Sequence, residues 1–165
     1  MKVYVSIFLF IFSITACETA PVETESADYP NAELLIEAED LNAIASEAGV
    51  IVIDAREEPG DTLVPGSVHF AARSELADSD HPIEQYLIGP DTFETKMQEL
   101  GLSGSSRVFI YDTGNHLSSA RLFYALEYYG FGNAAVLNGG LQGWLDASLP
   151  ISDQHAEPEQ GDFEV

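Results

Sequence analysis

Carboxylates follow two aliphatic runs of the sequence. Asp54 ends the run 50–54, and Asp112 directly follows the run 107–111. Such runs of β-branched and aromatic residues predict strands that are buried on both faces, as in a parallel sheet. Ligands of parallel sheets bind beyond the carboxyl ends of the strands. The sequence therefore places any chemistry in the loops after Asp54, Asp112 and Asn138, the last of which ends a third aliphatic run.

The sequence contains none of the short motifs of nucleotide-dependent or hydrolytic enzymes. It has no G-x-x-x-x-G-K-[ST] loop, which excludes a P-loop NTPase, and no G-x-S-x-G elbow. Gly139 and Gly140 follow the last predicted strand instead of the first, so we interpret them as positions of close backbone approach and not as a dinucleotide fingerprint. The four histidines have no metal-ligand spacing and there is a single cysteine, so we expect no metal and no cofactor.

The charge of the chain excludes whole classes of partner. Six Lys and Arg against 28 Asp and Glu give a formal net charge of −22, which repels phosphate backbones. We therefore expect no nucleic-acid partner and interpret most carboxylates as a solvated surface. With 165 residues, of which 45% are hydrophobic, the chain has the size and composition of one globular domain.

The N-terminal segment resembles the leader of a bacterial lipoprotein. About a dozen apolar residues after Lys2 are too few to span a bilayer but typical of a signal peptide. They lead into Ile-Thr-Ala-Cys, which resembles a lipobox that ends at Cys17. The resemblance implies a signal peptide (1–16), a lipid on Cys17 that anchors the chain to the membrane, an acidic tether (17–32) and a periplasmic location on the cell envelope. The outer membrane is favoured because residue 18 is Glu and not Asp. The alternative is an ordinary signal peptide with a chance cysteine.

Helical patterns separate the aliphatic runs. Two helices are predicted over 91–100 and 118–129, each closed by a glycine. An earlier helix that ends near Ala48 is predicted from apolar residues at roughly helical spacing, namely Leu34, Leu35, Leu41 and Ile44. The alternation of strands and helices predicts an α/β domain with a parallel sheet.

Five segments, in chain order, resemble the signatures of the rhodanese-type sulfurtransferases. They are 52–57, 64–70, 108–112, 120–121 and 136–144. The resemblance implies an α/β fold, a rhodanese-like three-layer domain over 33–151 with a central parallel sheet flanked by helices. It also implies an activity class, the transfer of sulfur from thiosulfate or 3-mercaptopyruvate to an acceptor.

The catalytic position of that family is altered in this sequence. Active members carry a persulfide-forming cysteine directly after the second strand, at the mouth of a loop whose backbone N–H groups bind an anion. Asp112 occupies that position, and a carboxylate cannot form a persulfide, so we expect this chain alone to be inactive. We also expect the long loop to lack a tight anion cradle. This degenerate active-site loop comprises Asp112, Thr113, Gly114, Asn115, His116, Leu117 and Ser118.

The loop and the trailing Ala120-Arg121 resemble the N-terminal, non-catalytic half of tandem sulfurtransferases. The resemblance implies that the partner is a C-terminal catalytic rhodanese domain, joined through an acidic linker or tail (152–165). The alternative is a stand-alone inactive module that binds a partner protein or an anion. A third hypothesis is a different enzyme that uses Asp112 as nucleophile or acid, for which the sequence offers no second catalytic group.

Four further residues are assigned from the sequence. Asp54, Arg56 and Arg121 are candidate cleft residues. Arg56 is expected first of all to pair with a neighbouring acid such as Asp54, and Arg121 to clamp the Asp112 loop. Trp144 is expected to lie in the core.

Overall fold

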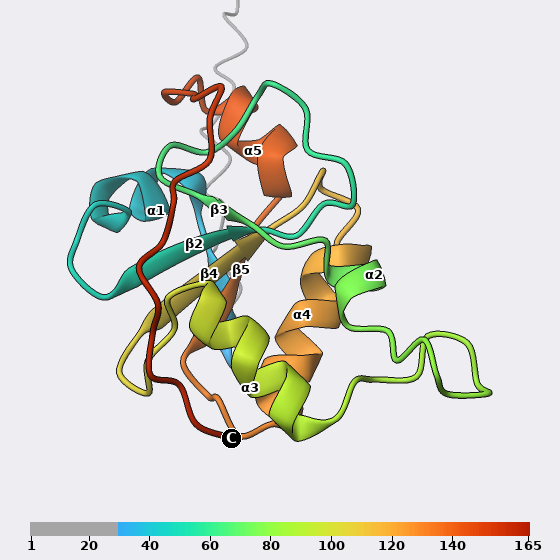
Figure 1. Ribbon diagram of the computed structural model, residues 1–165. Helices are drawn as coiled ribbons and strands as arrows, with labels where there is room; N and C mark the ends of the chain where they lie inside the picture. Colours follow the sequence, from blue (N-terminus) through green and yellow to red (C-terminus); the bar gives the residue numbers. More distant parts are fainter. Residues whose placement is uncertain (1–29) are drawn as a thin grey trace, which may run out of the picture.

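The computed structural model describes residues 30–165, which form three layers around a five-stranded parallel sheet (Figure 1). The strand order is β1-β5-β4-β2-β3. The predicted signal peptide and Cys17 lie outside the described residues. The strands are β1 (Leu35–Ile36), β2 (Val50–Asp54), β3 (Val68–His69), β4 (Arg107–Tyr111) and β5 (Ala134–Leu137). The helices are α1 (Ala38–Ile44), α2 (Ala72–Glu75), α3 (Pro90–Glu99), α4 (Leu117–Tyr128) and α5 (Gly140–Asp146), and a 3-10 turn, Ala32–Leu34, precedes β1.

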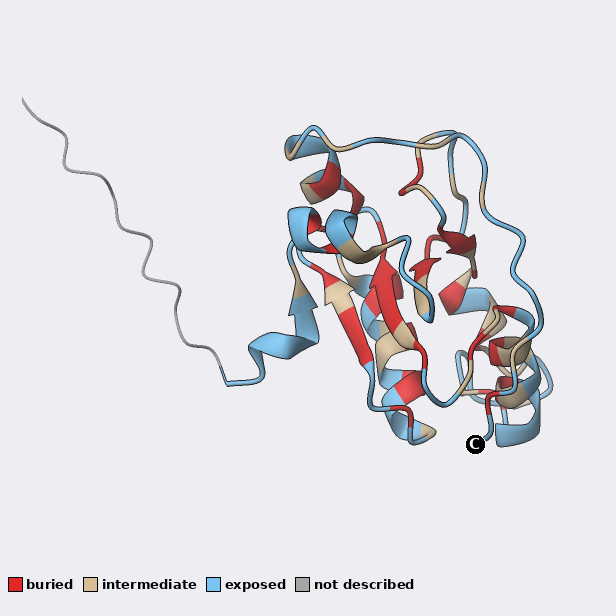
Figure 2. Ribbon diagram, turned by 90° about the vertical axis from the view of Figure 1, so that its left-hand side faces the viewer, coloured by how far each residue is buried: buried red, intermediate tan, exposed pale blue. Residues whose placement is uncertain are grey.

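Alternating side chains of the central strands build two cores. Val108 and Ile110 of β4 pack in the cluster covered by α2, α3 and α4, whereas Phe109 and Tyr111 pack in the cluster covered by α1 and α5. Successive side chains of a strand point to opposite faces, so a strand that is apolar at every position is buried on both. Trp144 of α5 lies in the second core, as predicted, and is 1% exposed. Figure 2 shows the central strands as the mostly buried layer of the domain.

The α/β class and the parallel sheet are confirmed, and most predicted elements lie within a residue or two of their observed bounds. The predicted helix over 34–48 is wrong at its start. Leu35 and Ile36 instead pair in parallel with Val136 and Leu137 of β5, and α1 begins only at Ala38. A two-residue strand carries too little periodicity to be separated from a neighbouring helix.

The segment 152–165, predicted as a linker or tail, lies along the domain. Ser152 forms an antiparallel bridge with Leu63, and the N–H of Phe163 donates to the carbonyl of Leu102 at 3.0 Å. The Phe163 side chain enters the first core and is 3% exposed. Figure 1 shows the segment running from α5 down past β2 and β3 to the end of the chain beside α3.

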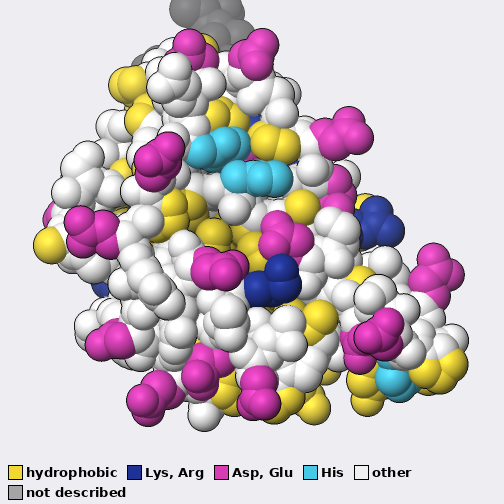
Figure 3. All heavy atoms as spheres, viewed as in Figure 1, with side chains coloured by type: hydrophobic (Ala, Val, Ile, Leu, Met, Phe, Trp, Pro, Cys, Tyr) yellow, Lys and Arg dark blue, Asp and Glu magenta, His cyan; other side chains and the backbone are white. Residues whose placement is uncertain are grey.

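The surface reflects the composition. Acidic side chains spread over the face drawn in Figure 3 without gathering into one patch. Within residues 30–165, no helix combines the length and the apolar character needed to cross a membrane.

Candidate functional site

The carboxylate of Asp112 is surrounded by donors of the loop that follows it. Its Oδ1 accepts the backbone N–H groups of Gly114 at 2.8 Å and His116 at 3.1 Å. Its Oδ2 accepts the N–H groups of Ser118 and Ser119 and the hydroxyl of Ser119, each at 3.2 Å. Asp112 is 2% exposed. Five donors therefore converge on one buried anion.

Helix α4 supplies part of this cradle. The first N–H groups of a helix have no partner inside the helix and carry partial positive charge, which favours an anion at that end. Ser118 and Ser119 lie in the first turn of α4, so Asp112 satisfies two of these groups from the preceding strand end. His116, directly before the helix, has a left-handed backbone with φ 59°, and its N–H is one of the five donors.

The loop packs against the glycine turn that follows β5. A Cβ on Gly140 would lie 2.6 Å from the nitrogen of Gly114 and 2.7 Å from the oxygen of Asp112. The N–H of Leu141 donates to that same oxygen at 2.8 Å. The interpretation of these glycines as positions of close backbone approach is confirmed, because a side chain at Gly140 would displace the Asp112 loop.

The expectation of a loop without an anion cradle is wrong. The cradle is present, and the Asp112 carboxylate fills it. The length of the loop does not determine whether it forms a cradle. The direction of its N–H groups depends on the backbone angles, here positive φ values at Gly114 and His116. The cradle holds an anion that belongs to the chain itself.

The remaining residues of the loop shape it or face solvent. The Oδ1 of Asn115 accepts the N–H of Leu117 at 3.1 Å. Thr113, Asn115 and Leu117 are exposed, and the buried Nδ1 of the His116 ring has no hydrogen-bond partner among the described residues. The exposed side chains are thus a hydroxyl, an amide and an aliphatic group, none of which can carry a persulfide.

Asp54 and Arg56 form a buried ion pair at the end of β2. Nε of Arg56 donates to Oδ1 of Asp54 at 2.8 Å, and Nη2 donates to Oδ2 at 2.6 Å. The same Nη2 donates to the carbonyl of Thr62 at 3.1 Å, which ties the loop after β2 to the pair. Asp54 is 0% exposed and Arg56 is 9% exposed. Both side chains thus hold the end of β2 in place.

Burial and charge set the ionisation of this cluster. Burial alone would raise the pKa of Asp54, but the hydrogen bonds and charge of Arg56, with a hydrogen bond from His155, outweigh it and the pKa is lowered. The hydrogen bond to Asp54 raises the pKa of Arg56 in spite of its desolvation. Burial and the charge of Asp54 raise the pKa of Tyr111. At neutral pH the pair is charged and Tyr111 carries its proton.

Arg121 does not clamp the Asp112 loop, so that prediction is wrong. Its Nη2 donates to the carbonyls of Leu76 at 3.3 Å and Gln85 at 3.0 Å. Arg121 lies more than a turn into α4, on the side that faces the segment between α2 and α3. The first turn of the helix, and not this guanidinium, stabilises the Asp112 carboxylate.

Comparison with known proteins decides the family. The family model of the rhodanese-like domain matches residues 37–147. The chain belongs to the rhodanese-like domain family. The 3-mercaptopyruvate sulfurtransferase of Escherichia coli K12 is 33% identical over 100 residues, which are 61% of this chain and 35% of that protein. The thiosulfate sulfurtransferase of Cricetulus griseus is 31% identical over 114 residues, which are 67% of this chain and 38% of that protein.

Solved structures agree with this assignment. The crystal structure of SseA, a 3-mercaptopyruvate sulfotransferase of Escherichia coli, has a TM-score of 0.73 at 27% identity and covers 80% of this chain and 55% of that one. Tum1 of Saccharomyces cerevisiae has a TM-score of 0.66 at 19% identity, covers 79% of this chain and 48% of that one, and shares the fold. The rhodanese-like chain thus spans between about a third and about half of the relatives it matches.

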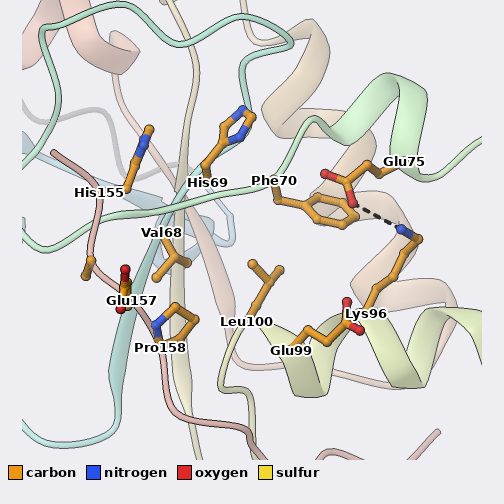
Figure 4. A pocket seen from close by; sticks show the side chains of 11 residues that line it. Val68, His69, Phe70, Glu75, Lys96, Glu99, Leu100, His155, Glu157 and Pro158 are labelled. Atoms are coloured by element: carbon orange, nitrogen blue, oxygen red, sulfur yellow. Dashed lines mark hydrogen bonds and ion pairs between the residues drawn. The ribbon is translucent and has the colours of Figure 1, made fainter.

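The rhodanese-like fold also brings together two histidines that are far apart in the sequence, His69 and His155. The ring centroids of His69, at the end of β3, and His155, in the tail, are 5.3 Å apart. Both residues line a pocket of about 360 Å³, which Phe70 and Leu100 also line (Figure 4). No pattern in the sequence marks this pair, because residue 155 falls in the predicted linker or tail and its spacing from residue 69 matches no motif.

Proposed function

We propose that this rhodanese-like domain is the non-catalytic half of a tandem sulfurtransferase. In this proposal a second rhodanese-like domain carries the cysteine that takes sulfur from thiosulfate or 3-mercaptopyruvate, and the present domain forms part of the cleft wall. The observation that carries the proposal is the Asp112 carboxylate, which is buried and bound by five donors at the strand end where active members have their nucleophile.

The lengths of the relatives support the tandem arrangement. The matched part amounts to 35% of the Escherichia coli enzyme and 38% of the Cricetulus griseus enzyme, so most of each relative lies outside the match.

The activity test is direct. The purified protein is expected to form no thiocyanate from thiosulfate and cyanide above the rate in buffer. Turnover that survives Asp112→Asn would show a nucleophile elsewhere in the chain and would overturn the assignment of an inactive domain.

The size of the native protein separates the tandem arrangement from its alternative. An antibody raised to residues 33–150 is expected to detect a membrane protein of about twice the 17.9 kDa of this chain. A band at or below 17.9 kDa would instead identify a stand-alone domain.

The second candidate is a stand-alone inactive module that binds a partner protein. One stripe of α4 favours it, because Leu117, Tyr124 and Tyr128 are 65%, 60% and 63% exposed. Tyr86 and Ile83 extend this surface from the neighbouring loop and are 49% and 61% exposed. Clustered tyrosines are typical of the centre of protein interfaces.

A different enzyme that uses Asp112 as nucleophile or acid is the least supported hypothesis. A nucleophile needs a free lone pair that faces the substrate, whereas both oxygens of Asp112 already accept hydrogen bonds and the residue is 2% exposed. Loss of a measurable activity in Asp112→Asn, with the fold intact, would revive this hypothesis.

The location is proposed from the sequence. Cys17 is taken as a lipidation site that anchors the acidic domain to the periplasmic side of the cell envelope, with the outer membrane favoured. Radioactive palmitate is expected to label the protein, and a label that persists in Cys17→Ser would refute the lipid anchor. Membrane fractionation of labelled cells tests the choice of membrane.

A further inference from the structure

We propose that His69 and His155 together bind a divalent transition-metal ion. Their ring centroids are 5.3 Å apart and the ring planes are inclined by 31°. Figure 4 shows the two side chains rising side by side from β3 and from the tail, on the same side of the pocket. This proposal is independent of the function proposed above.

Hydrogen bonds fix which ring nitrogen of each histidine carries the proton. Nε2 of His69 lies 2.8 Å from the carbonyl oxygen of Arg56, which only accepts, so this nitrogen is the donor. Nε2 of His155 lies 3.2 Å from Oδ2 of Asp54, a carboxylate held ionised by Arg56, so this nitrogen donates too. In the neutral rings both Nδ1 atoms therefore carry lone pairs. Neither Nδ1 has a hydrogen-bond partner within residues 30–165.

The partners of the two rings are those of metal ligands. A histidine that binds a metal through one nitrogen usually donates the other N–H to a carboxylate or a backbone carbonyl, which fixes the ring and makes it a better ligand. His155 has the carboxylate of Asp54, and His69 has the carbonyl of Arg56. The pair thus has both standard supports before any metal arrives.

The distance between the ring centroids is compatible with one shared ion. A Zn–N bond of about 2.0–2.1 Å places the centroids of two imidazoles on one tetrahedral ion about 5 Å apart, and the observed separation is 5.3 Å. Imidazole pairs favour Zn²⁺, Cu²⁺ and Ni²⁺ over Mg²⁺ and Ca²⁺. The net charge of −22 raises the local concentration of cations around the domain.

The site has two protein ligands. The described part of the chain holds no group of three or more His, Cys, Asp or Glu side chains that could share a metal. Water therefore completes the coordination, and the bound ion exchanges with solution. Binding joins β3 to the tail next to the hydrogen bond from the N–H of Ala156 to the carbonyl of Ser67, at 2.8 Å.

Calorimetric titration of the full chain, carrying Cys17→Ser to remove the thiol, tests the site with ZnCl₂ and with NiCl₂. One equivalent of either ion is expected to bind, and MgCl₂ at the same concentration is expected not to compete. His69→Gln and His155→Gln should each weaken binding at least tenfold. His81→Gln is the matched control, because His81 stacks on Tyr86 and does not belong to the pair. It should leave the affinity unchanged. Equal affinity in all four proteins would overturn the proposal.

Two further measurements keep both histidines intact, so that misfolding of a variant cannot explain their result. Substoichiometric CuCl₂ is expected to broaden the ring resonances of His69 and His155 before those of His81, and the reverse order would overturn the site. ZnCl₂ is expected to slow hydrogen exchange of the Ala156 amide, because the ion joins the tail to β3. An unchanged exchange rate at saturating ZnCl₂ would show that the ion binds elsewhere.

Discussion

Arg56 binds both carboxylate oxygens of Asp54, at 2.8 and 2.6 Å, where neither residue is more than 9% exposed. A buried ion pair of this kind stabilises little over an apolar pair, but breaking it leaves an uncompensated charge in the interior. The pair also ties the loop after β2 to the strand through Thr62. The stability of this strand end therefore depends on both partners being present.

Arg56→Ala is expected to lower the free energy of unfolding by about 3–5 kcal/mol, because Asp54 then remains buried without its partner. Urea denaturation at neutral pH measures this. Arg107→Ala is the control, since Arg107 pairs with Glu47 at 2.6 Å but the two side chains are 42% and 56% exposed; it should cost less than about 1 kcal/mol. Equal losses in the two variants would contradict the role of burial.

In Arg56→Ala the stability contribution of Asp54 is expected to depend on pH in the opposite sense. In the wild type the pKa of Asp54 is lowered from 3.8. The ionised carboxylate therefore stabilises the folded state fully above pH 3.8, and this stabilisation is lost as the pH falls through the lowered pKa. Without Arg56, burial raises the pKa of Asp54, and protonation then favours the folded state. The stability difference between the two proteins is expected to shrink as the pH falls from neutral toward the ordinary Asp pKa of 3.8. A constant difference would show that Asp54 is not responsible.

Asp112→Asn tests the filled cradle. An amide keeps one acceptor oxygen but turns its NH₂ group toward N–H donors of the loop, which are left unpaired. The expected loss is about 2–3 kcal/mol in urea denaturation. Asp153→Asn, at an exposed position of the tail, should change the stability by less than about 0.5 kcal/mol. If Asp112→Asn left the stability unchanged, the five donors would be satisfied by water in solution.

Tyr111→Phe tests the hydroxyl beneath the ion pair. This hydroxyl lies 3.1 Å from Oγ of Ser67 and accepts the N–H of Val64 at 3.3 Å. Its removal is expected to cost about 1–2 kcal/mol, whereas Tyr124→Phe, on a side chain that is 60% exposed, should cost nothing measurable.

Alkaline titration provides an independent check on Tyr111. Because its pKa is raised, the phenolate absorbance of one tyrosine is expected to appear only when the wild-type protein unfolds. Tyr111→Phe should abolish this late step, and its persistence in the variant would assign the step to another tyrosine.

The sheet could be predicted from the sequence where burial on both faces leaves a continuous apolar run. Strands β2, β4 and β5 have such runs and were located to within a residue. The edge strands β1 and β3 have two residues each, and a pattern needs more positions than that to show a period. Their existence depends on backbone pairing with β5 and β2, which is a tertiary effect.

The candidate site was predictable only in part. The position of Asp112 is predictable because it follows a recognisable strand, but the filled cradle is not, since it depends on backbone angles at Gly114 and His116. The predicted role of Arg121 is wrong because proximity in sequence says little about the side of a helix on which a residue lies. The pair of His69 and His155 needs the tail to dock beside β3, and an acidic, polar segment gives no sign of docking.

Phe163→Ala tests that docking. The ring is 3% exposed in the first core, with its centroid 6.1 Å from that of Phe93 and 5.8 Å from that of Phe131. Removing a buried phenylalanine ring is expected to cost about 3–5 kcal/mol. Ile151→Ala is the control, because Ile151 is 55% exposed, and its expected loss is below about 1 kcal/mol. If the segment 152–165 were a detached linker in solution, both variants would unfold at the wild-type urea concentration, and the metal site at His155 would lose its support at the same time.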